Sequence, residues 1–142
     1  EISAQVFQSE VCRLDLLQQV RYLGRKYGAD KELCFQQADL FILPSLNECF
    51  PLVLLEAMQH SLPCISTRVG GIEGIIDHKK TGLLTEPDCP KSLADAIEYM
   101  IVHPQEADEM GRMGKEKFLC KFTLQHFEKN ITSILKHEIL HN

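Results

Sequence analysis

The sequence predicts an α/β fold built on a mostly parallel sheet, and three observations lead to this prediction. Short apolar runs alternate with segments of helical spacing along the chain, as in βαβ units. The run Leu40–Leu43 is apolar at every position and stops at Pro44, as expected of a strand buried on both faces of a parallel sheet. The 142 residues, 44% hydrophobic and 25% charged, suit a single folded domain. We therefore expect residues 1–142 to form one α/β domain.

Four segments are predicted as strands, because each is a short apolar or β-branched run bounded by turn residues. They are Val20–Leu23, Leu40–Leu43, Cys64–Thr67 and Gly82–Thr85. Ligands of parallel sheets bind beyond the carboxyl ends of the strands. The site is therefore expected among the segments that follow three of these strands, which are Gly24–Lys26, Pro44–Pro51 and Thr67–Gly71.

Helices are predicted between and after these strands, and the chain is expected to open in an irregular polar stretch. The first three helices are Lys31–Gln37, Pro51–His60 and Ile72–Ile76. Pro51 suits the first helical position, where a missing N–H costs nothing. Three more helices follow Pro90, and the middle one ends near Cys120. The apolar residues of each helix share one face. These are Leu93, Ile97, Met100 and Ile101 in the first helix, Ala107, Met110 and Phe118 in the second, and Leu124, Phe127, Ile131, Ile134 and Leu135 in the last. Thr123 is the predicted N-cap of the last helix.

Composition narrows the classes of protein to consider. A net charge of -5 and a pI near 5.7 provide no basic field for a nucleic-acid backbone, so no nucleic-acid partner is expected. The six cysteines include no C-x-x-C pair, which favours reduced thiols in the cytoplasm. No apolar run is long enough to cross a bilayer. Because the chain opens at Glu1 in a polar stretch, we expect it to be a piece of a longer protein.

The segment Pro44–Met58, P-S-L-N-E-C-F-P-L-V-L-L-E-A-M, carries the main functional signal. Its loop leaves a predicted strand and leads into a helix N-terminus, where free N–H groups and the helix dipole favour an anion such as phosphate. Glu48 lies in this loop, and Glu56 is the only polar residue of Leu52–Met58. A carboxylate in such an apolar run needs a donor partner. The pattern indicates a phosphate site with a carboxylate on each side of it.

These two acids also allow other interpretations. Glu56 alone is more often a structural carboxylate, held for example by Arg68 or by a backbone amide, and Glu48 alone can be a solvated loop residue. As a second enzymatic reading, the two acids could be the catalytic pair of a glycosidase. Glu56, however, lies more than a helical turn beyond Pro51, which favours separate contacts along an extended ligand over a pair about 5 to 9.5 Å apart.

The segments A-D-L-F-I-L-P-S-L-N-E-C-F-P-L-V-L-L-E-A-M, P-C-I-S-T-R-V-G-G-I-E-G-I-I-D and T-G-L-L resemble the donor-binding, C-terminal domain of retaining GT-B glycosyltransferases of family four, the group 1 glycosyl transferases. The resemblance runs from about Val20 to the C-terminus. It implies a Rossmann-like, doubly wound parallel sheet with a helical C-terminal part. It also implies a UDP- or GDP-linked sugar as donor substrate, with no cofactor or metal.

The resemblance implies roles for individual residues. Glu48 would contact the hydroxyls of the donor sugar and act as the catalytic residue, and Glu56 would accept bonds from the ribose hydroxyls. The turn Gly24-Arg25 would lie against the base. The main chain between the two acids would hold the sugar and the diphosphate, through Cys49, Phe50, Pro51, Leu52 and Val53.

The chain also departs from the family pattern. Cys49 stands where the family usually has glycine, and Glu73 precedes Gly74 where the glutamate usually follows. No segment before Val20 matches the V-G-R strand and K-G helix whose Arg and Lys neutralise the diphosphate in the family. We therefore expect the first strands of this domain to be absent, and the exposed sheet edge to pair with another copy or with the missing part of the protein.

The resemblance further implies that the acceptor site lies on an absent N-terminal domain, which would also make any peripheral membrane contact. The chain alone would then be inactive as a transferase. A runner-up of another class is a non-catalytic α/β module for assembly or nucleotide binding, in which Glu56 is only a structural carboxylate. A literal H-E-x-x-H at His137–His141 has zinc-ligand spacing, but no third ligand follows it, so no metal site is expected.

Overall fold

A computed structural model of the chain describes the backbone of residues 3–140 and the side chains of residues 3–136. The chain divides into two compact units, Glu1–Cys34 and Phe35–Asn142. Helix α2, Gly28–Gln36, leads from the first unit into the second.

The first unit begins with a helix, contrary to the irregular segment that we expected. Helix α1, Ala4–Arg13, starts at Ser3, whose hydroxyl accepts a hydrogen bond from the Val6 N–H at 3.3 Å, a standard N-cap contact. The predicted strand Val20–Leu23 is wrong, because this segment is irregular. Instead of pairing in a sheet, it packs against α1, with the rings of Tyr22 and Phe7 5.4 Å apart. An apolar run becomes a strand only where a neighbouring strand supplies its hydrogen bonds.

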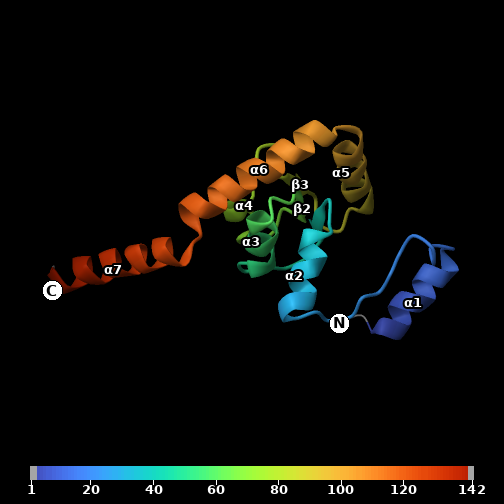
Figure 1. The fold of residues 1–142 in the computed structure, drawn as a ribbon, viewed down its shortest axis with the longest axis horizontal. Helices are drawn as coiled ribbons and strands as arrows, with labels where there is room; N and C mark the ends of the chain where they lie inside the picture. Colours follow the sequence, from blue (N-terminus) through green and yellow to red (C-terminus); the bar gives the residue numbers. More distant parts are fainter. Residues whose placement is uncertain (1–2, 141–142) are drawn as a thin grey trace. The chain divides into compact units, whose positions relative to one another are not determined.

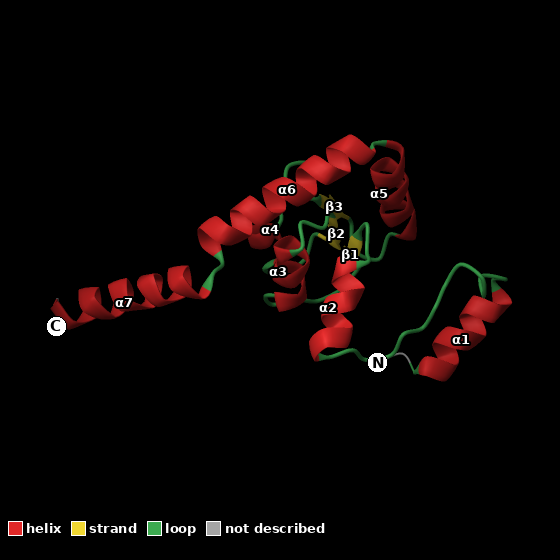
Figure 2. Cartoon of the chain, in the orientation of Figure 1, coloured by secondary structure: helices red, strands yellow, loops and turns green. Residues whose placement is uncertain are grey.

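The second unit contains a parallel sheet of the kind predicted. Its three strands are β1 (Phe41–Leu43), β2 (Cys64–Thr67) and β3 (Leu83–Thr85), in the order β1-β2-β3 (Figure 2). Ile42 lies opposite Ile65 in the first pair, and Ile65 lies opposite Leu83 in the second. All three carboxyl ends therefore meet at one edge of the sheet.

Five helices of this unit follow the predicted order. They are α3 (Leu52–Gln59), α4 (Ile72–Ile75), α5 (Pro90–Val102), α6 (Pro104–Lys121) and α7 (Leu124–Leu140). Pro90 and Pro104 occupy the first positions of α5 and α6, where proline is well tolerated. Thr123 caps α7 as predicted, since its hydroxyl accepts a hydrogen bond from the His126 N–H at 3.4 Å.

The core lies on both faces of the sheet. On one face, α3 and α4 bury a cluster that includes Leu54, Met58 and Ile72. On the other, α5 and α6 bury a cluster around Ile65 and Met100. Figure 2 shows α3 and α5 on opposite sides of the strands. Helices on both faces of a parallel sheet confirm the predicted α/β class.

Two of the predicted apolar faces are partly or wholly exposed. Ile101 was expected on the apolar face of α5, but its side chain is 69% exposed. The whole apolar stripe of α7 is also exposed, although its residues share one face as predicted. Figure 1 shows α7 extending beyond the end of α6. Helical spacing predicts that residues share a face, but it does not say what covers that face.

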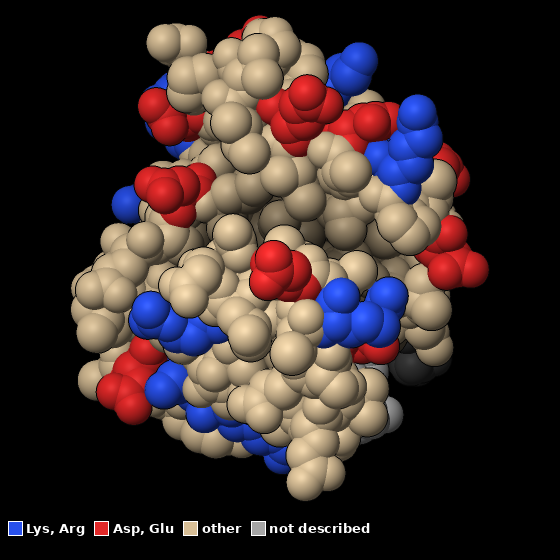
Figure 3. Space-filling model, turned by 90° about the vertical axis from the view of Figure 1, so that its right-hand side faces the viewer, with Lys and Arg blue, Asp and Glu red and all other residues tan. Residues whose placement is uncertain are grey.

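Charges of both signs are distributed over the surface. Figure 3 shows one face on which Lys and Arg side chains are interspersed with Asp and Glu, in keeping with a net charge of -5. None of the helices in the part of the chain that the structure describes has the length and hydropathy of a membrane span.

Candidate functional site

Buried hydroxyl groups hold the carboxyl ends of the three strands together. The Ser66 hydroxyl donates to the Leu43 carbonyl at 2.8 Å, and the Thr85 hydroxyl donates to the Ser66 carbonyl at 3.3 Å. The Thr67 hydroxyl donates to the carbonyl of Ser45, just beyond β1. These side chains are buried, so their hydrogen bonds offset the cost of removing hydroxyls from water. They give the carboxyl edge of the sheet a fixed geometry.

A cavity of about 280 Å³ opens at this edge. Its floor includes Thr67 and Thr85 at the strand ends, and one wall includes Pro44 and Leu46 after β1. The opposite wall is the segment Glu86–Leu93 after β3, represented by Glu86, Asp88, Cys89, Pro90 and Leu93. Ligand pockets usually span about 300–1,000 Å³. The cavity is therefore large enough for part of an extended ligand.

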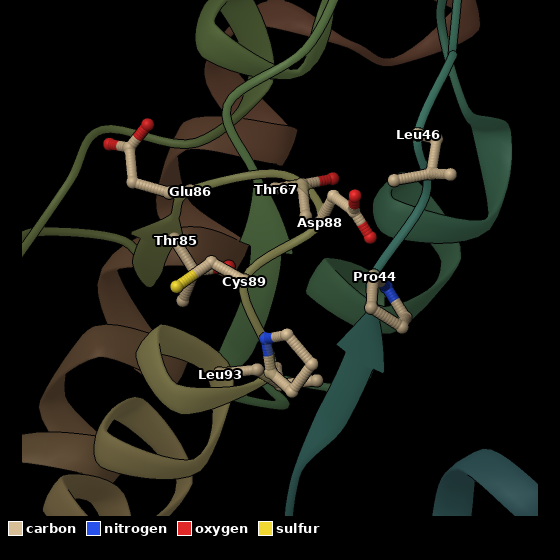
Figure 4. A pocket seen from close by; sticks show the side chains of 9 residues that line it. Pro44, Leu46, Thr67, Thr85, Glu86, Asp88, Cys89 and Leu93 are labelled. Atoms are coloured by element: carbon tan, nitrogen blue, oxygen red, sulfur yellow. The ribbon is translucent and has the colours of Figure 1, made fainter.

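The two carboxylates of the cavity wall point in different directions. Figure 4 shows the Asp88 carboxylate directed toward the space between Thr67 and Leu46, whereas the Glu86 carboxylate points away from them. Asp88 has a φ of 51°, a left-handed conformation that Asp tolerates better than most residues. Asp88 is thus the carboxylate that faces into the cavity.

Glu48 lies in the same loop as Leu46, and the structure fixes it at two points. Its Oε1 accepts a hydrogen bond from the Ser45 hydroxyl at 2.8 Å. Its main chain lies against the turn after β2, where a Cβ built on Gly70 would come 1.7 Å from the Glu48 carbonyl oxygen. Gly70 has a φ of 51°, so both space and backbone conformation require glycine there. The next contact, from the Gly71 N–H to the Cys49 carbonyl, measures 2.9 Å.

The N-terminus of α3 follows this loop directly. Pro51 is the N-cap and makes no side-chain capping bond. As Pro51 lacks an N–H, the main-chain donors of the predicted segment are those of Cys49, Phe50, Leu52 and Val53. The side chains of Phe50 and Leu52 are exposed. The positive end of the helix dipole therefore lies at an exposed part of the carboxyl edge.

Glu56 lies on the outer face of α3 rather than among buried side chains. Residues four and seven positions along a helix share a face, and Leu52, Glu56 and Gln59 have this spacing. Leu52 is 66% exposed, Gln59 is exposed and Glu56 is half-buried. The apolar residues around Glu56 predicted a helix that is buried on all sides. Only the inward positions of α3 are buried, among them Leu54 and Met58.

The structure brings together some of the predicted site residues. Glu48, the segment Cys49–Val53 and Glu56 follow one another from the loop into α3. Neither glutamate lines the cavity. Gly24 and Arg25 belong to the first unit, so their place against a base remains a prediction.

The sequence reasoning missed the wall after β3. Asp88 and Cys89 belong to a segment that follows the third strand. The strand-end rule that selected the segments after the other three predicted strands applies equally to this one, and Pro87 marked it as a loop. Applying the rule to every predicted strand would have found the residues.

Arg68 and His78, next to β2 and β3, are engaged in local contacts. Arg68, which was considered as a partner of Glu56, pairs with Glu73 at 2.8 Å and with Glu86 at 3.9 Å. The Leu84 N–H donates to Nδ1 of His78 at 2.9 Å. Desolvation, followed by the charges of Arg68 and Lys79, lowers the pKa of His78 from its usual 6.5. A neutral imidazole keeps Nδ1 available as the acceptor.

The predicted zinc-spaced motif ends outside the described residues, because His141 is not described and the side chains of 137–140 are not either. Within residues 3–136, no group of three or more His, Cys, Asp or Glu side chains is arranged to hold a metal ion.

Comparison with known proteins decides the family. Residues 4–117, well over half of the chain, match the family described as "Glycosyl transferases group 1". The chain belongs to the group 1 glycosyltransferases. Among curated relatives, it is 34% identical over 110 residues to D-rhamnosyltransferase WbpZ of Pseudomonas aeruginosa, covering 75% of this chain and 29% of that protein. It is 36% identical over 112 residues to N-acetyl-alpha-D-glucosaminyl L-malate synthase of Bacillus anthracis, covering 79% and 29%.

Solved structures of glycosyltransferases share the fold. HepE of Anabaena in complex with UDP superposes with a TM-score of 0.86 at 25% identity, covering 94% of this chain and 36% of that protein. Sucrose-phosphate synthase of Thermosynechococcus elongatus gives a TM-score of 0.85 at 26% identity, covering 97% and 35%. This group 1 chain thus has the α/β fold of GT-B glycosyltransferases and spans about a third of these relatives.

Proposed function

We propose that this chain binds a nucleotide-activated sugar, UDP- or GDP-linked, and forms the donor-binding part of a hexosyltransferase. The observation that carries the proposal is the exposed N-terminus of α3 at the carboxyl edge of the sheet. This N-terminus has no side-chain cap, and it directly follows the loop in which Ser45 holds the Glu48 carboxylate. Main-chain N–H groups at a helix N-terminus suit a diphosphate. The carboxylate of Glu48 suits the hydroxyls of a sugar, because an ionised carboxylate is a strong acceptor.

Each part of the donor has its own contact in this arrangement. The diphosphate lies against the α3 N-terminus and the Cys49–Val53 main chain, and Glu48 contacts the sugar as the catalytic residue. Glu56, on the outer face of α3, accepts bonds from the ribose, and Gly24-Arg25 lies against the base. The family match and the fold shared with HepE, whose structures contain UDP and UDP-glucose, support this assignment.

The leaving diphosphate needs electrostatic stabilisation as its bond to the sugar breaks. A helix N-terminus carries about half a positive charge, and donors that are already oriented stabilise developing charge without reorganising. We propose that this arrangement acts without a metal ion or other cofactor. Donor binding should then be the same with and without EDTA.

NMR titration of this chain with UDP, GDP, ADP and their sugar derivatives tests the proposal. We expect saturable shifts for at least one nucleotide-sugar, and a loss of affinity of about tenfold or more in both Glu48→Ala and Glu56→Ala, since a hydrogen bond to a charged group contributes about 1.5–3 kcal/mol. Glu98→Ala is the matched control, because Glu98 is exposed on α5.

Two outcomes would contradict the proposal. Absence of saturable binding for every nucleotide would favour the non-catalytic assembly module. Equal weakening by Glu98→Ala would show that the effect of the glutamates is not local. Hydrolysis of a chromogenic glycoside by this chain would instead support the glycosidase reading.

For the whole protein, we propose transfer of the sugar to an acceptor with retention of configuration, as in family four of the GT-B enzymes. The acceptor site and any peripheral membrane contact would lie on a separate N-terminal domain, in a cytoplasmic protein of polysaccharide biosynthesis. The anomeric configuration of the product, read by NMR from a reaction of the full-length protein, tests retention. An inverted product would contradict it.

The expected sheet edge needs one correction. Val20–Leu23 forms no strand, and β1 is the strand at one end of the observed order. We propose that the outer edge of β1 pairs with another copy of the chain or with a strand from outside residues 1–142. Light scattering that shows a monomer at high concentration would exclude pairing between copies.

A further inference from the structure

Ser45 connects the sheet to the side chain of Glu48. Its hydroxyl donates to Oε1 of Glu48 at 2.8 Å, and its carbonyl accepts the hydroxyl of Thr67. Thr67 is the last residue of β2 and is 3% exposed. A continuous path of two hydrogen bonds therefore runs from a buried strand end, through Ser45, to a partly exposed carboxylate.

The main chain of the same loop is fixed independently. Gly70 and Gly71 lie so close to the loop that a Cβ at either position would meet a carbonyl oxygen, at 1.7 Å for Glu48 and 2.1 Å for Cys49. The Gly71 N–H bonds to the Cys49 carbonyl at 2.9 Å. The glycines thus place the backbone of Glu48, and Ser45 makes a hydrogen bond to its side chain.

Glu48 retains an acceptor for a ligand in this arrangement. Ser45 engages Oε1, and within the described residues Oε2 has no hydrogen-bond partner. A free glutamate side chain loses conformational entropy worth up to about 1.5–2 kcal/mol when it is ordered. If Ser45 orders the side chain in advance, the ligand does not bear this cost.

We propose that Ser45 is a positioning residue that orients the Glu48 carboxylate toward the hydroxyls of the donor sugar. This inference rests on the proposed function and deepens it. It predicts that Ser45 affects the sugar half of the donor and leaves the nucleotide half unchanged. It also predicts that the effect passes through Glu48 alone.

The test compares each sugar nucleotide with its own nucleoside diphosphate, UDP-glucose with UDP and GDP-mannose with GDP, by NMR titration of this chain. For the pair that binds, Ser45→Ala should weaken the sugar nucleotide about fivefold, as expected for one hydrogen bond. The nucleoside diphosphate should change less than about twofold. Ser45→Thr keeps the hydroxyl and should restore the affinity for the sugar nucleotide.

A double-mutant cycle shows whether the effect passes through Glu48. Adding Ser45→Ala to Glu48→Ala should cause no further loss of affinity for the sugar nucleotide. Ser66→Ala is the matched control, because Ser66 also donates its hydroxyl at 2.8 Å, in this case to the carbonyl of Leu43 at the end of β1. Its loss should lower stability but leave the ratio of the two affinities unchanged.

The outcomes separate this inference from the proposed function. If the unaltered chain binds none of the four ligands, the proposed function fails, and the role of Ser45 fails with it. If the chain binds but Ser45→Ala weakens both members of a pair equally, only the positioning role is overturned. The same conclusion follows if Ser45→Ala still weakens binding in the Glu48→Ala background.

Discussion

Cys89 directly precedes α5, but its side chain does not cap the helix. It is the N-cap of Pro90–Val102, yet it makes no side-chain capping hydrogen bond. Ser, Asp and Asn at this position accept a bond from the N–H of the second or third helical residue, and such caps contribute typically about 1 kcal/mol. A weak cap therefore stands on the cavity wall next to Asp88.

Replacing this cysteine should stabilise the protein. We expect Cys89→Ser to raise the free energy of unfolding by about 1 kcal/mol, measured by urea denaturation. Cys120→Ser is the control, since Cys120 is exposed within α6 and Cys and Ser have similar helix propensity. An equal gain in both variants would show that capping is not the cause.

His78 should make stability depend on pH. Its folded-state pKa lies below the usual 6.5, because of desolvation first and then the charges of Arg68 and Lys79. Between these two pKa values the unfolded state binds more protons, so the stability from neutral His78 is complete above about pH 6.5. It falls as the pH drops below 6.5, and the loss levels off below the folded pKa.

His78→Asn isolates this contribution, because the Asn carbonyl can accept the Leu84 N–H without titrating. Urea denaturation at several pH values should show that the unaltered chain loses stability more steeply than the variant below about pH 6.5. Parallel curves would contradict the prediction.

At the scale of elements, α6 depends on a close approach to its neighbours. A Cβ on Gly111 would come 2.1 Å from the Ser61 carbonyl oxygen, which lies in the connection between α3 and β2. The helix can therefore pack closely against this connection only because the residue has no side chain. Met110, next to Gly111, is buried in one core cluster, and Phe118, farther along the same helix, packs against the other.

Gly111→Ala should destabilise the chain by about 1–3 kcal/mol, as expected when a packed contact is overfilled. Gly74→Ala is the matched control, because it also lies in a helix but has nothing within 4 Å of its Cβ position. There, alanine should stabilise by up to about 1 kcal/mol. Thermal unfolding of both variants measures the difference, and a similar loss in each would contradict the packing argument.

At the scale of the whole molecule, the apolar residues divide into those that hold the fold and those that remain at the surface. Met58 is fully buried between α3 and its neighbours. Ile134, on the apolar stripe of α7, is 60% exposed. Both belong to helices with an apolar face, so the sequence alone does not distinguish the buried residue from the exposed one.

Truncating these two residues should have very different effects. Met58→Ala should lower the free energy of unfolding by about 2–5 kcal/mol, whereas Ile134→Ala should change it by less than about 0.5 kcal/mol. Chemical denaturation of this chain measures both. A large loss in Ile134→Ala would show that the α7 stripe is packed in solution.

The sequence by itself determined the order of elements in Phe35–Asn142, the parallel sheet, and the contiguous segment from Glu48 to Glu56. These follow from local spacing and turn residues, which act over a few positions. It did not reveal that Val20–Leu23 lacks a strand partner, that Glu56 lies on the outer face of α3, or that Asp88 faces a cavity beside Leu46. Tertiary structure decided these points, because strand pairing, burial and cavities depend on which distant segments meet.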